Sequence, residues 1–270
     1  MRVGWLSTGR DPAARTLLAE IVARATADEI GLRIGAVFCD RERGESDQSD
    51  AFHALVADLG FPMVALSSAR SWAATRAAGT SREAWRADFH DEVVRLLQPF
   101  GLDVLVLAGY MLIVSPAMCA RYALLNLHPA LPGGPTGTWQ EVIWALLAGH
   151  ADETGAMIHL VTPELDRGPL VTFDRYRIDG GVFAPLWCAF DAKVLRDGLG
   201  TVAAAEGEAE PLFAAVRQCG EAREIPLLYR TVKQFVVGRL RAHGGHVEAT
   251  DVELPLDLSA EVDAELAARP

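Results

Sequence analysis

The sequence predicts an α/β protein with a doubly wound, mostly parallel sheet of the Rossmann type, followed by a helical C-terminal extension. Short apolar runs alternate with longer segments of helical periodicity through roughly the first 180 residues. Repeated strand–helix units of this kind build parallel sheets. The run 102–108 (LDVLVLA) is almost continuously apolar, which is typical of a strand covered on both faces.

The first hundred residues contain three predicted strands and three predicted helices. Asp11 followed by Pro12 indicates a helix start, because an aspartate N-cap and a proline in the first turn both favour one. Apolar positions recur at helical spacing between 83 and 98. The expected strands are 2–6, 32–39 and 63–66, and the expected helices are 13–26, 49–59 and 83–98.

The rest of the chain continues the alternation and then becomes helical. After the strand 102–108 we expect a strand that ends at Asn126–His128, a helix at 140–148, a strand at 155–161 and an edge strand at 170–177. Helices are expected at 189–199, 211–219 and 225–241, with an acidic stretch at 203–210 between the first two. We therefore expect a catalytic domain over 1–185, a helical part packed on it over 186–242, and an extended tail over 243–270.

Composition narrows the classes of function. The 270 residues are 50% hydrophobic, and no run approaches the roughly 18 uncharged apolar residues of a membrane span. A net charge of −11 argues against nucleic acid or an anionic membrane as the main partner. The four cysteines are far apart, and no metal or nucleotide motif is found, so no metal site is expected. The apolar stretch at the N-terminus is too short for a signal peptide, which indicates a cytoplasmic protein.

Two linked motifs carry the chemistry. In the run Asn126-Leu127-His128-Pro129, the period of two along a strand places an amide and an imidazole on one face. Asp166 follows 38 residues after His128. An amide donor can stabilise the oxyanion of acyl transfer, and a histidine supported by a carboxylate can move a proton.

Three blocks of sequence occur in one order: AGYMLIVSP at 108–116, NLHP at 126–129 and ELDRGP at 164–169. Together they resemble the folate-dependent formyltransferases, most closely the glycinamide ribonucleotide (phosphoribosylglycinamide) transformylases of purine biosynthesis. The resemblance implies a doubly wound α/β fold and an enzyme of one-carbon metabolism. Such an enzyme passes a formyl group from 10-formyltetrahydrofolate to the amine of a small metabolite.

The resemblance also assigns residues to roles. It implies a catalytic trio of Asn126, His128 and Asp166. It implies folate contacts at Arg82, Met111, Leu112, Ile113, Val114, Val161, Thr162 and Leu165. It implies contacts with the acceptor substrate at Ser7, Thr8, Gly9, Arg10, Asp11, Pro132 and Glu221. His159 is expected to be a hydrogen-bonded core histidine without a catalytic role.

The loop after the first strand departs from the family pattern. Glycinamide ribonucleotide transformylases usually carry Ser-Gly-x-Gly-Ser-Asn there, whose small residues let backbone N–H groups approach a phosphate. Here the loop keeps one glycine, Gly9, while Pro12 lacks an N–H and Asp11 adds a negative charge. Either Arg10 or Arg15 pairs with a substrate phosphate, or Asp11 only caps the helix and Arg10 is solvated.

Several functions therefore stay open. The acceptor is expected to be glycinamide ribonucleotide or a related amine. The alternatives are a 10-formyltetrahydrofolate hydrolase, a sugar-amine N-formyltransferase, and a non-catalytic folate-binding protein. The expected partners are folate and a small amine, and a homodimer is left open.

Overall fold

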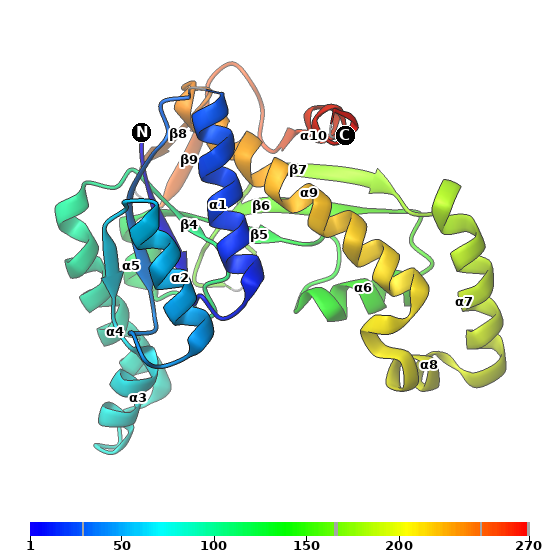
Figure 1. Cartoon of the computed structure of the whole chain (residues 1–270), viewed down its shortest axis with the longest axis horizontal. Coiled ribbons are helices and arrows are strands. Elements are labelled where there is room, and N and C mark those ends of the chain that lie inside the picture. The colour runs from blue at the N-terminus through cyan, green and yellow to red at the C-terminus, as the bar shows by residue number, and fades with distance from the viewer. Residues whose placement is uncertain (29, 165–166, 244, 269–270) are drawn as a thin grey trace. The chain divides into compact units, whose positions relative to one another are not determined.

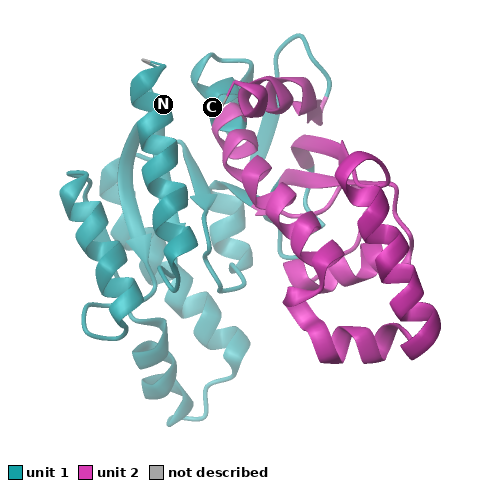
Figure 2. Cartoon of the chain, turned by 45° about the vertical axis from the view of Figure 1, so that its right-hand side comes forward, with its two compact units in different colours: residues 1–126, 159–169, 231–253 teal, residues 127–158, 170–230, 254–270 magenta. Residues whose placement is uncertain are grey.

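The computed structural model describes residues 1–28, 30–164, 167–243 and 245–268. Contacts divide the chain into two compact units, each assembled from three separate stretches (Figure 2). Unit 1 comprises 1–126, 159–169 and 231–253, and unit 2 comprises 127–158, 170–230 and 254–270. The expected division into catalytic domain, helical part and tail concerns function and stays a prediction.

The sheet of unit 1 is parallel and doubly wound (Figure 1). Its strands run in the order β3-β2-β1-β4-β5, so the chain builds outward from β1 to one side and then returns to build on the other. This order confirms the predicted fold class. The strands are β1 (Arg2–Ser7), β2 (Arg33–Cys39), β3 (Met63–Ala65), β4 (Val104–Leu107) and β5 (Ala123–His128).

Helices connect these strands, and their starts follow local capping signals. Asp11 caps the first helix as predicted, since its side chain accepts a hydrogen bond from the N–H of Ala14 at 3.0 Å. Two helices were not predicted: α3 has no buried residue and so no apolar period, and α5 is only six residues long. The helices of unit 1 are α1 (Pro12–Ala27), α2 (Asp47–Asp58), α3 (Ser68–Arg76), α4 (Arg82–Leu97) and α5 (Pro116–Arg121), with a 3₁₀ turn at Gln98–Phe100.

The core of unit 1 forms where strands and helices pack their apolar faces together. Phe38 of β2 and Leu105 of β4 share one cluster with Trp85, Phe89 and Val93 of α4. These three residues are buried on α4. Burying each large side chain contributes about 1.5–3 kcal/mol to the free energy of unfolding. The cluster therefore stabilises the strands whose ends carry the candidate site residues.

Unit 2 contains β6 (Glu153–Leu160, whose last two residues belong to unit 1) and β7 (Leu170–Arg177). Within unit 2 the strand order is β6-β7-β10, and β10 (Leu256–Asp257) pairs in parallel with β7. The expectation that 170–177 is an edge strand is therefore wrong, because two residues of the tail pair with it. The helices are α6 (Trp139–Ala148), α7 (Ala184–Asp197), α8 (Leu199–Glu206), α9 (Pro211–Val236, whose residues from 231 onward belong to unit 1) and α10 (Ser259–Ala267), with 3₁₀ turns at Gly181–Phe183 and Gly207–Ala209.

The C-terminal region departs most from the sequence expectation. The stretch 203–210, expected to separate two helices, is itself mostly helical. The helices expected at 211–219 and 225–241 form one helix, α9, with Pro226 inside it. Proline removes one helical hydrogen bond, but burial of Leu227 and Leu228 directly after it favours continuation of the helix.

The tail is not extended throughout, which corrects that expectation. It contains the antiparallel pair β8 (Leu240–His243) and β9 (His246–Ala249) and then α10, which buries Val262. Its short elements give no apolar period long enough to read from sequence. Among the described residues, no helix is long and apolar enough to cross a membrane.

Candidate functional site

Asn126 lies near the end of β5, opposite Leu107 of β4. Its Nδ2 amide donates to Nε2 of His159 at 3.1 Å, and Nδ1 of His159 donates to the carbonyl oxygen of Leu160 at 3.0 Å. These two bonds select the neutral tautomer with its proton on Nδ1. Because Nδ2 carries two hydrogens and His159 accepts one, the orientation of the amide is fixed while the other hydrogen can serve a substrate.

His159 is the functional side chain that sequence reasoning underrated. It is 2% exposed and hydrogen-bonded, as expected of a core histidine. The structure adds that it holds the side chain of Asn126. A contact between residues 33 positions apart leaves no local pattern. Only the placement of Asn126 and His159 at the ends of two adjacent strands could have suggested it.

His128 is the last residue of β5 and is 3% exposed. Its Nε2–H donates to the carbonyl oxygen of Pro135 at 3.1 Å, within unit 2. The Pro- and Gly-rich segment after β5, which includes Pro132, thus folds back and orients the imidazole. Because Nε2 faces a carbonyl oxygen, it carries a proton.

Backbone hydrogen bonds fix the two ends of the segment that follows β6. Val161 N–H donates to the carbonyl of Leu124 at 2.8 Å, and Leu160 N–H donates to the carbonyl of Pro169 at 2.9 Å. Gly168 packs so closely that an added Cβ would overlap the carbonyl oxygen of Leu160. Thr162 donates from its hydroxyl to the carbonyl of Glu164 at 3.0 Å. The predicted residues Leu165 and Asp166 lie outside the described residues.

The segment expected to contact folate exposes alternate side chains. Met111 is 52% and Ile113 43% exposed, whereas Leu112 and Val114 pack against the core of unit 1. Behind them the hydroxyl of the buried Tyr110 lies 3.2 Å from Nε2 of His90. Two exposed apolar side chains on a supported loop suit contact with a flat ring system, which is the part of a folate expected there.

The loop after β1 folds onto the same segment. Thr8 N–H donates to the carbonyl of Gly109 at 3.0 Å, and Met111 N–H donates to the hydroxyl of Thr8 at 3.1 Å. Gly9 N–H donates to the hydroxyl of Ser7 at 3.1 Å. Gly9 has φ of +58°, and a Cβ on it would lie 3.0 Å from Phe52. These hydrogen bonds therefore bring the loop predicted to contact the acceptor substrate next to the segment predicted to contact folate.

Asp40 directly follows β2 and was not singled out from the sequence. It is 3% exposed, and its Oδ2 accepts from the hydroxyl of Ser68 at 2.8 Å. Its Oδ1 has no hydrogen-bond partner among the described residues. Burial raises the pKa of this carboxyl, against the opposing influence of the Thr8 and Ser68 hydroxyls. A charged residue that ends a buried strand was the available signal.

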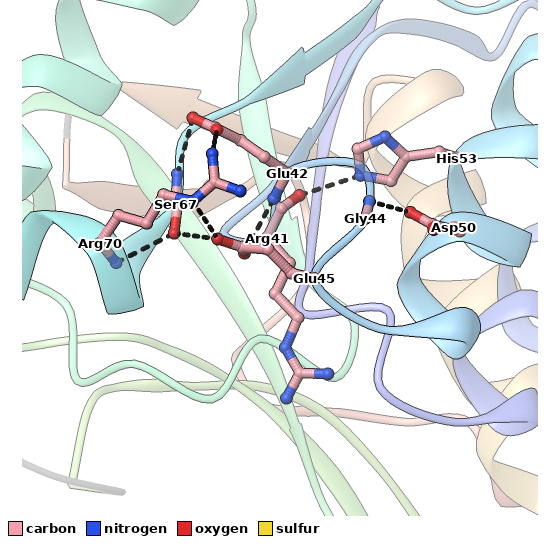
Figure 3. A network of polar contacts seen from close by, with 8 residues as sticks. All are labelled: Arg41, Glu42, Gly44, Glu45, Asp50, His53, Ser67 and Arg70. Atoms are coloured by element: carbon pink, nitrogen blue, oxygen red, sulfur yellow. Dashed lines mark hydrogen bonds and ion pairs between the residues drawn. The ribbon is translucent and has the colours of Figure 1, made fainter.

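The loop after Asp40 is held by a polar network (Figure 3). Arg70 donates to Glu42 at 2.7 Å and lies 3.2 Å from Glu45. The hydroxyl of Ser67 also donates to Glu45, and His53 donates to the carbonyl of Arg41 at 2.9 Å. In Figure 3 the guanidinium of Arg41 points away from this network. The network fixes the loop at the carboxyl end of β2.

Arg82 and Glu221 have partners within the protein. The guanidinium of Arg82 lies 5.2 Å from the ring centroid of Trp72 and 6.0 Å from that of Trp85, so it is stacked on aromatic rings. In unit 2, Glu221 is exposed and pairs with Arg217 at 2.7 Å. Glu224 pairs with the same arginine at 2.8 Å, and its deeper burial raises its pKa. Sequence reasoning did not single out Glu224.

Within the described ranges, no group of three or more His, Cys, Asp or Glu side chains lies together in a way that could hold a metal ion. A cavity of about 510 Å³ lies between α1 and β2, lined by Val22, Thr26, Arg33 and Phe61 among others. It adjoins the start of β2, whereas the predicted residues of unit 1 adjoin strand ends. It therefore belongs to a different part of unit 1.

Comparison with known proteins converges on one family. The model of the formyl transferase family matches residues 35–181. Phosphoribosylglycinamide formyltransferase of Escherichia coli is 39% identical over 97 residues, which are 34% of this chain and 41% of that enzyme. Formyltetrahydrofolate deformylase of Bacillus subtilis is 33% identical over 101 residues, 35% of this chain and 31% of that enzyme. The chain thus aligns with less than half the length of these curated relatives.

The fold extends further than the sequence similarity. The solved structure of phosphoribosylglycinamide formyltransferase from Coxiella burnetii superposes with a TM-score of 0.63 and covers 92% of this chain and 93% of that one. Sequence identity over this superposition is 19%, so the likeness concerns the fold.

Proposed function

Because the chain belongs to the formyl transferase family, whose model matches more than half of it, we propose that it transfers a formyl group from 10-formyltetrahydrofolate to the amine of a small metabolite. The observation that carries this proposal is the hydrogen bond that holds the side chain of Asn126 against His159. Asn126 itself lies two residues before His128. An amide oriented in this way is a preorganised donor, which stabilises developing negative charge more than it stabilises the ground state.

Each proposed catalytic residue has a distinct task. When an amine attacks the formyl carbon, its oxygen gains negative charge, and the second Nδ2 hydrogen of Asn126 would donate to it. His128, protonated on both ring nitrogens, would pass its Nε2 proton to the folate nitrogen as the bond from that nitrogen to the formyl carbon breaks, and the proton released by the attacking amine would restore the imidazolium. Asp166 would favour the protonated imidazole. Removing a single such donor costs about 100- to 1,000-fold in rate.

The residues present suit the formyl donor. The exposed side chains of Met111 and Ile113 offer an apolar surface, and Val161, Thr162 and Leu165 belong to the segment proposed to border it. Arg82 offers a cation for the anionic end of the folate, since its stacking on Trp72 and Trp85 leaves its hydrogen-bond donors for a ligand. When bound, the folate supplies the activated formyl group.

The proposal is tested by mixing the purified protein with 10-formyltetrahydrofolate, with and without a set of primary amines that includes glycinamide ribonucleotide. Tetrahydrofolate release is followed by absorbance. We expect release that depends on an amine, with one formylated amine for each tetrahydrofolate. Folate binding without release would contradict catalysis and favour a folate-binding protein.

A second candidate function is hydrolysis of 10-formyltetrahydrofolate. The similarity to the deformylase of Bacillus subtilis favours it, because water then takes the place of the amine while the same donors act. Release of formate and tetrahydrofolate at equal rates with and without amine would support hydrolysis and contradict transfer. A sugar-amine acceptor is a third outcome, identified by the formylated product.

A further inference from the structure

Side-chain and backbone groups of the protein itself occupy the N-terminus of α1. The N-terminus of the helix after the first strand of a doubly wound sheet is a ready anion site, because its free N–H groups and the helix dipole favour negative charge. Here the carboxylate of Asp11 takes that position, accepting from the N–H of Ala14 at 3.0 Å. Pro12, the first helical residue, has no N–H to offer.

The loop before α1 also makes its hydrogen bonds within the protein. The N–H of Thr8 donates to Gly109, and that of Gly9 donates to Ser7. The side chains of Ser7 and Thr8 are buried, and the Thr8 hydroxyl accepts from the N–H of Met111. These bonds stabilise the loop and leave its hydroxyls and two of its N–H groups engaged within the protein.

The two nearby arginines have protein partners as well. Nε of Arg10 lies 3.4 Å from the carboxylate of Asp11. Nη1 of Arg15 donates to the backbone and side-chain oxygens of Gln48, at 3.2 and 2.8 Å. A phosphate at this helix end would have to displace the Asp11 carboxylate and remain close to its negative charge, without a partner-free arginine to offset the repulsion.

We propose that Asp11 determines acceptor specificity: its carboxylate occupies the α1 N-terminus, so the acceptor amine is a phosphate-free compound, neutral or cationic where it meets residues 7–15. This inference rests on the proposed formyl transfer and narrows its substrate class. It places a phosphate-free amine, such as an amino sugar, ahead of a ribonucleotide.

The inference is tested without catalysis by titrating the ¹⁵N-labelled full chain with inorganic phosphate at constant ionic strength. The amide resonances of residues 10, 11, 13 and 14 are followed by NMR. We expect no saturable shift of these amides in the wild type. Asp11→Asn keeps a side-chain acceptor for the cap but removes the charge, so it should show saturable shifts at the same amides. Asp58→Asn, at an exposed position of α2, makes the same change in net charge and serves as the control.

Saturable shifts in the wild type would overturn the inference, and an Asp11→Asn variant without shifts would overturn the role of Asp11. With active protein, kcat/KM for glycinamide ribonucleotide should be no higher than for its dephosphorylated riboside. Asp11→Asn should raise that ratio by about fivefold, the scale of one charge at a helix end. If no amine is formylated at all, the proposed function fails, while the phosphate titration still decides this inference.

Discussion

At the scale of single residues, the proposed catalysis depends on Asn126 being held in one orientation. His159 provides that hold through Nε2, and the Leu160 carbonyl keeps the proton of His159 on Nδ1. The sequence predicted Asn126 and His128 because a strand end and a local motif mark them. It did not assign His159 to Asn126, because that contact depends on the pairing of two distant strands.

His159→Leu removes the acceptor for the Asn126 amide, and we expect kcat to fall by about 10- to 100-fold, the scale of a misplaced catalytic group. His159→Gln keeps a side-chain oxygen that can accept from the amide, so it should recover most of that loss. Steady-state kinetics and thermal melting of both variants provide the measurement. Equal kcat values in the two variants would contradict a positioning role.

The buried carboxyl of Asp40 should make stability depend on pH. Burial raises its pKa above the ordinary 3.8, so the folded state holds the proton more tightly than the unfolded state does. The stability from this group is therefore fully present at low pH, and it is lost as the pH rises through the raised pKa. Asp40→Asn does not titrate, and its free energy of unfolding relative to wild type should increase between pH 4 and pH 8.

Urea unfolding of wild type and Asp40→Asn at both pH values measures this difference. Asp47→Asn, at an exposed position of α2, controls for the change in net charge. A difference between Asp40→Asn and wild type that is the same at both pH values would contradict the raised pKa.

At the scale of elements, local signals predicted what local chemistry determines. The Asp11 cap identified the start of α1, and apolar positions at helical spacing between 83 and 98 identified α4. The helices α3 and α5 were missed because one buries nothing and the other is too short for a period. α9 was divided at Pro226 because burial of the following leucines is a tertiary effect that the proline signal does not show.

A substitution at Gly168 tests how closely the segment after β6 packs against the backbone of Leu160. A Cβ there would overlap the Leu160 carbonyl oxygen, which belongs to the backbone and cannot rotate away. We expect Gly168→Ala to destabilise the protein by roughly 1–3 kcal/mol and to lower activity, because the segment must shift. Gly31→Ala is the matched control, since nothing lies within 4 Å of its added Cβ. Equal melting temperatures for the two variants would contradict this packing.

At the scale of the whole molecule, each compact unit combines stretches that are distant in sequence. The alternation of strands and helices predicted the parallel sheet, since it depends only on the order of elements. It did not predict the contribution of the tail to unit 2, because two residues of β10 and the short helix α10 carry no readable period.

A buried ion pair joins three elements of unit 2. Arg223 of α9 donates two hydrogen bonds to Asp174 of β7, each at 2.7 Å, and one to Asp263 of α10 at 2.6 Å. Arg223→Met would leave the Asp174 carboxylate buried without its partner, and we expect a loss of about 3–5 kcal/mol in unfolding free energy. Chemical denaturation measures it. The exposed Arg196→Met should change stability by less than about 1 kcal/mol, and a similar loss there would contradict the assignment.

Formyl transfer is proposed to depend on the oriented amide of Asn126. The most direct measurement compares amine-dependent tetrahydrofolate release and thermal melting for wild type and Asn126→Asp. Aspartate has the same shape, and it pairs with His159 once that imidazole takes a second proton on Nε2, but its carboxylate cannot donate to an oxyanion. We expect a rate loss of about 100- to 1,000-fold with a nearly unchanged melting temperature. Retained turnover, or a loss of activity that only follows unfolding, would contradict it.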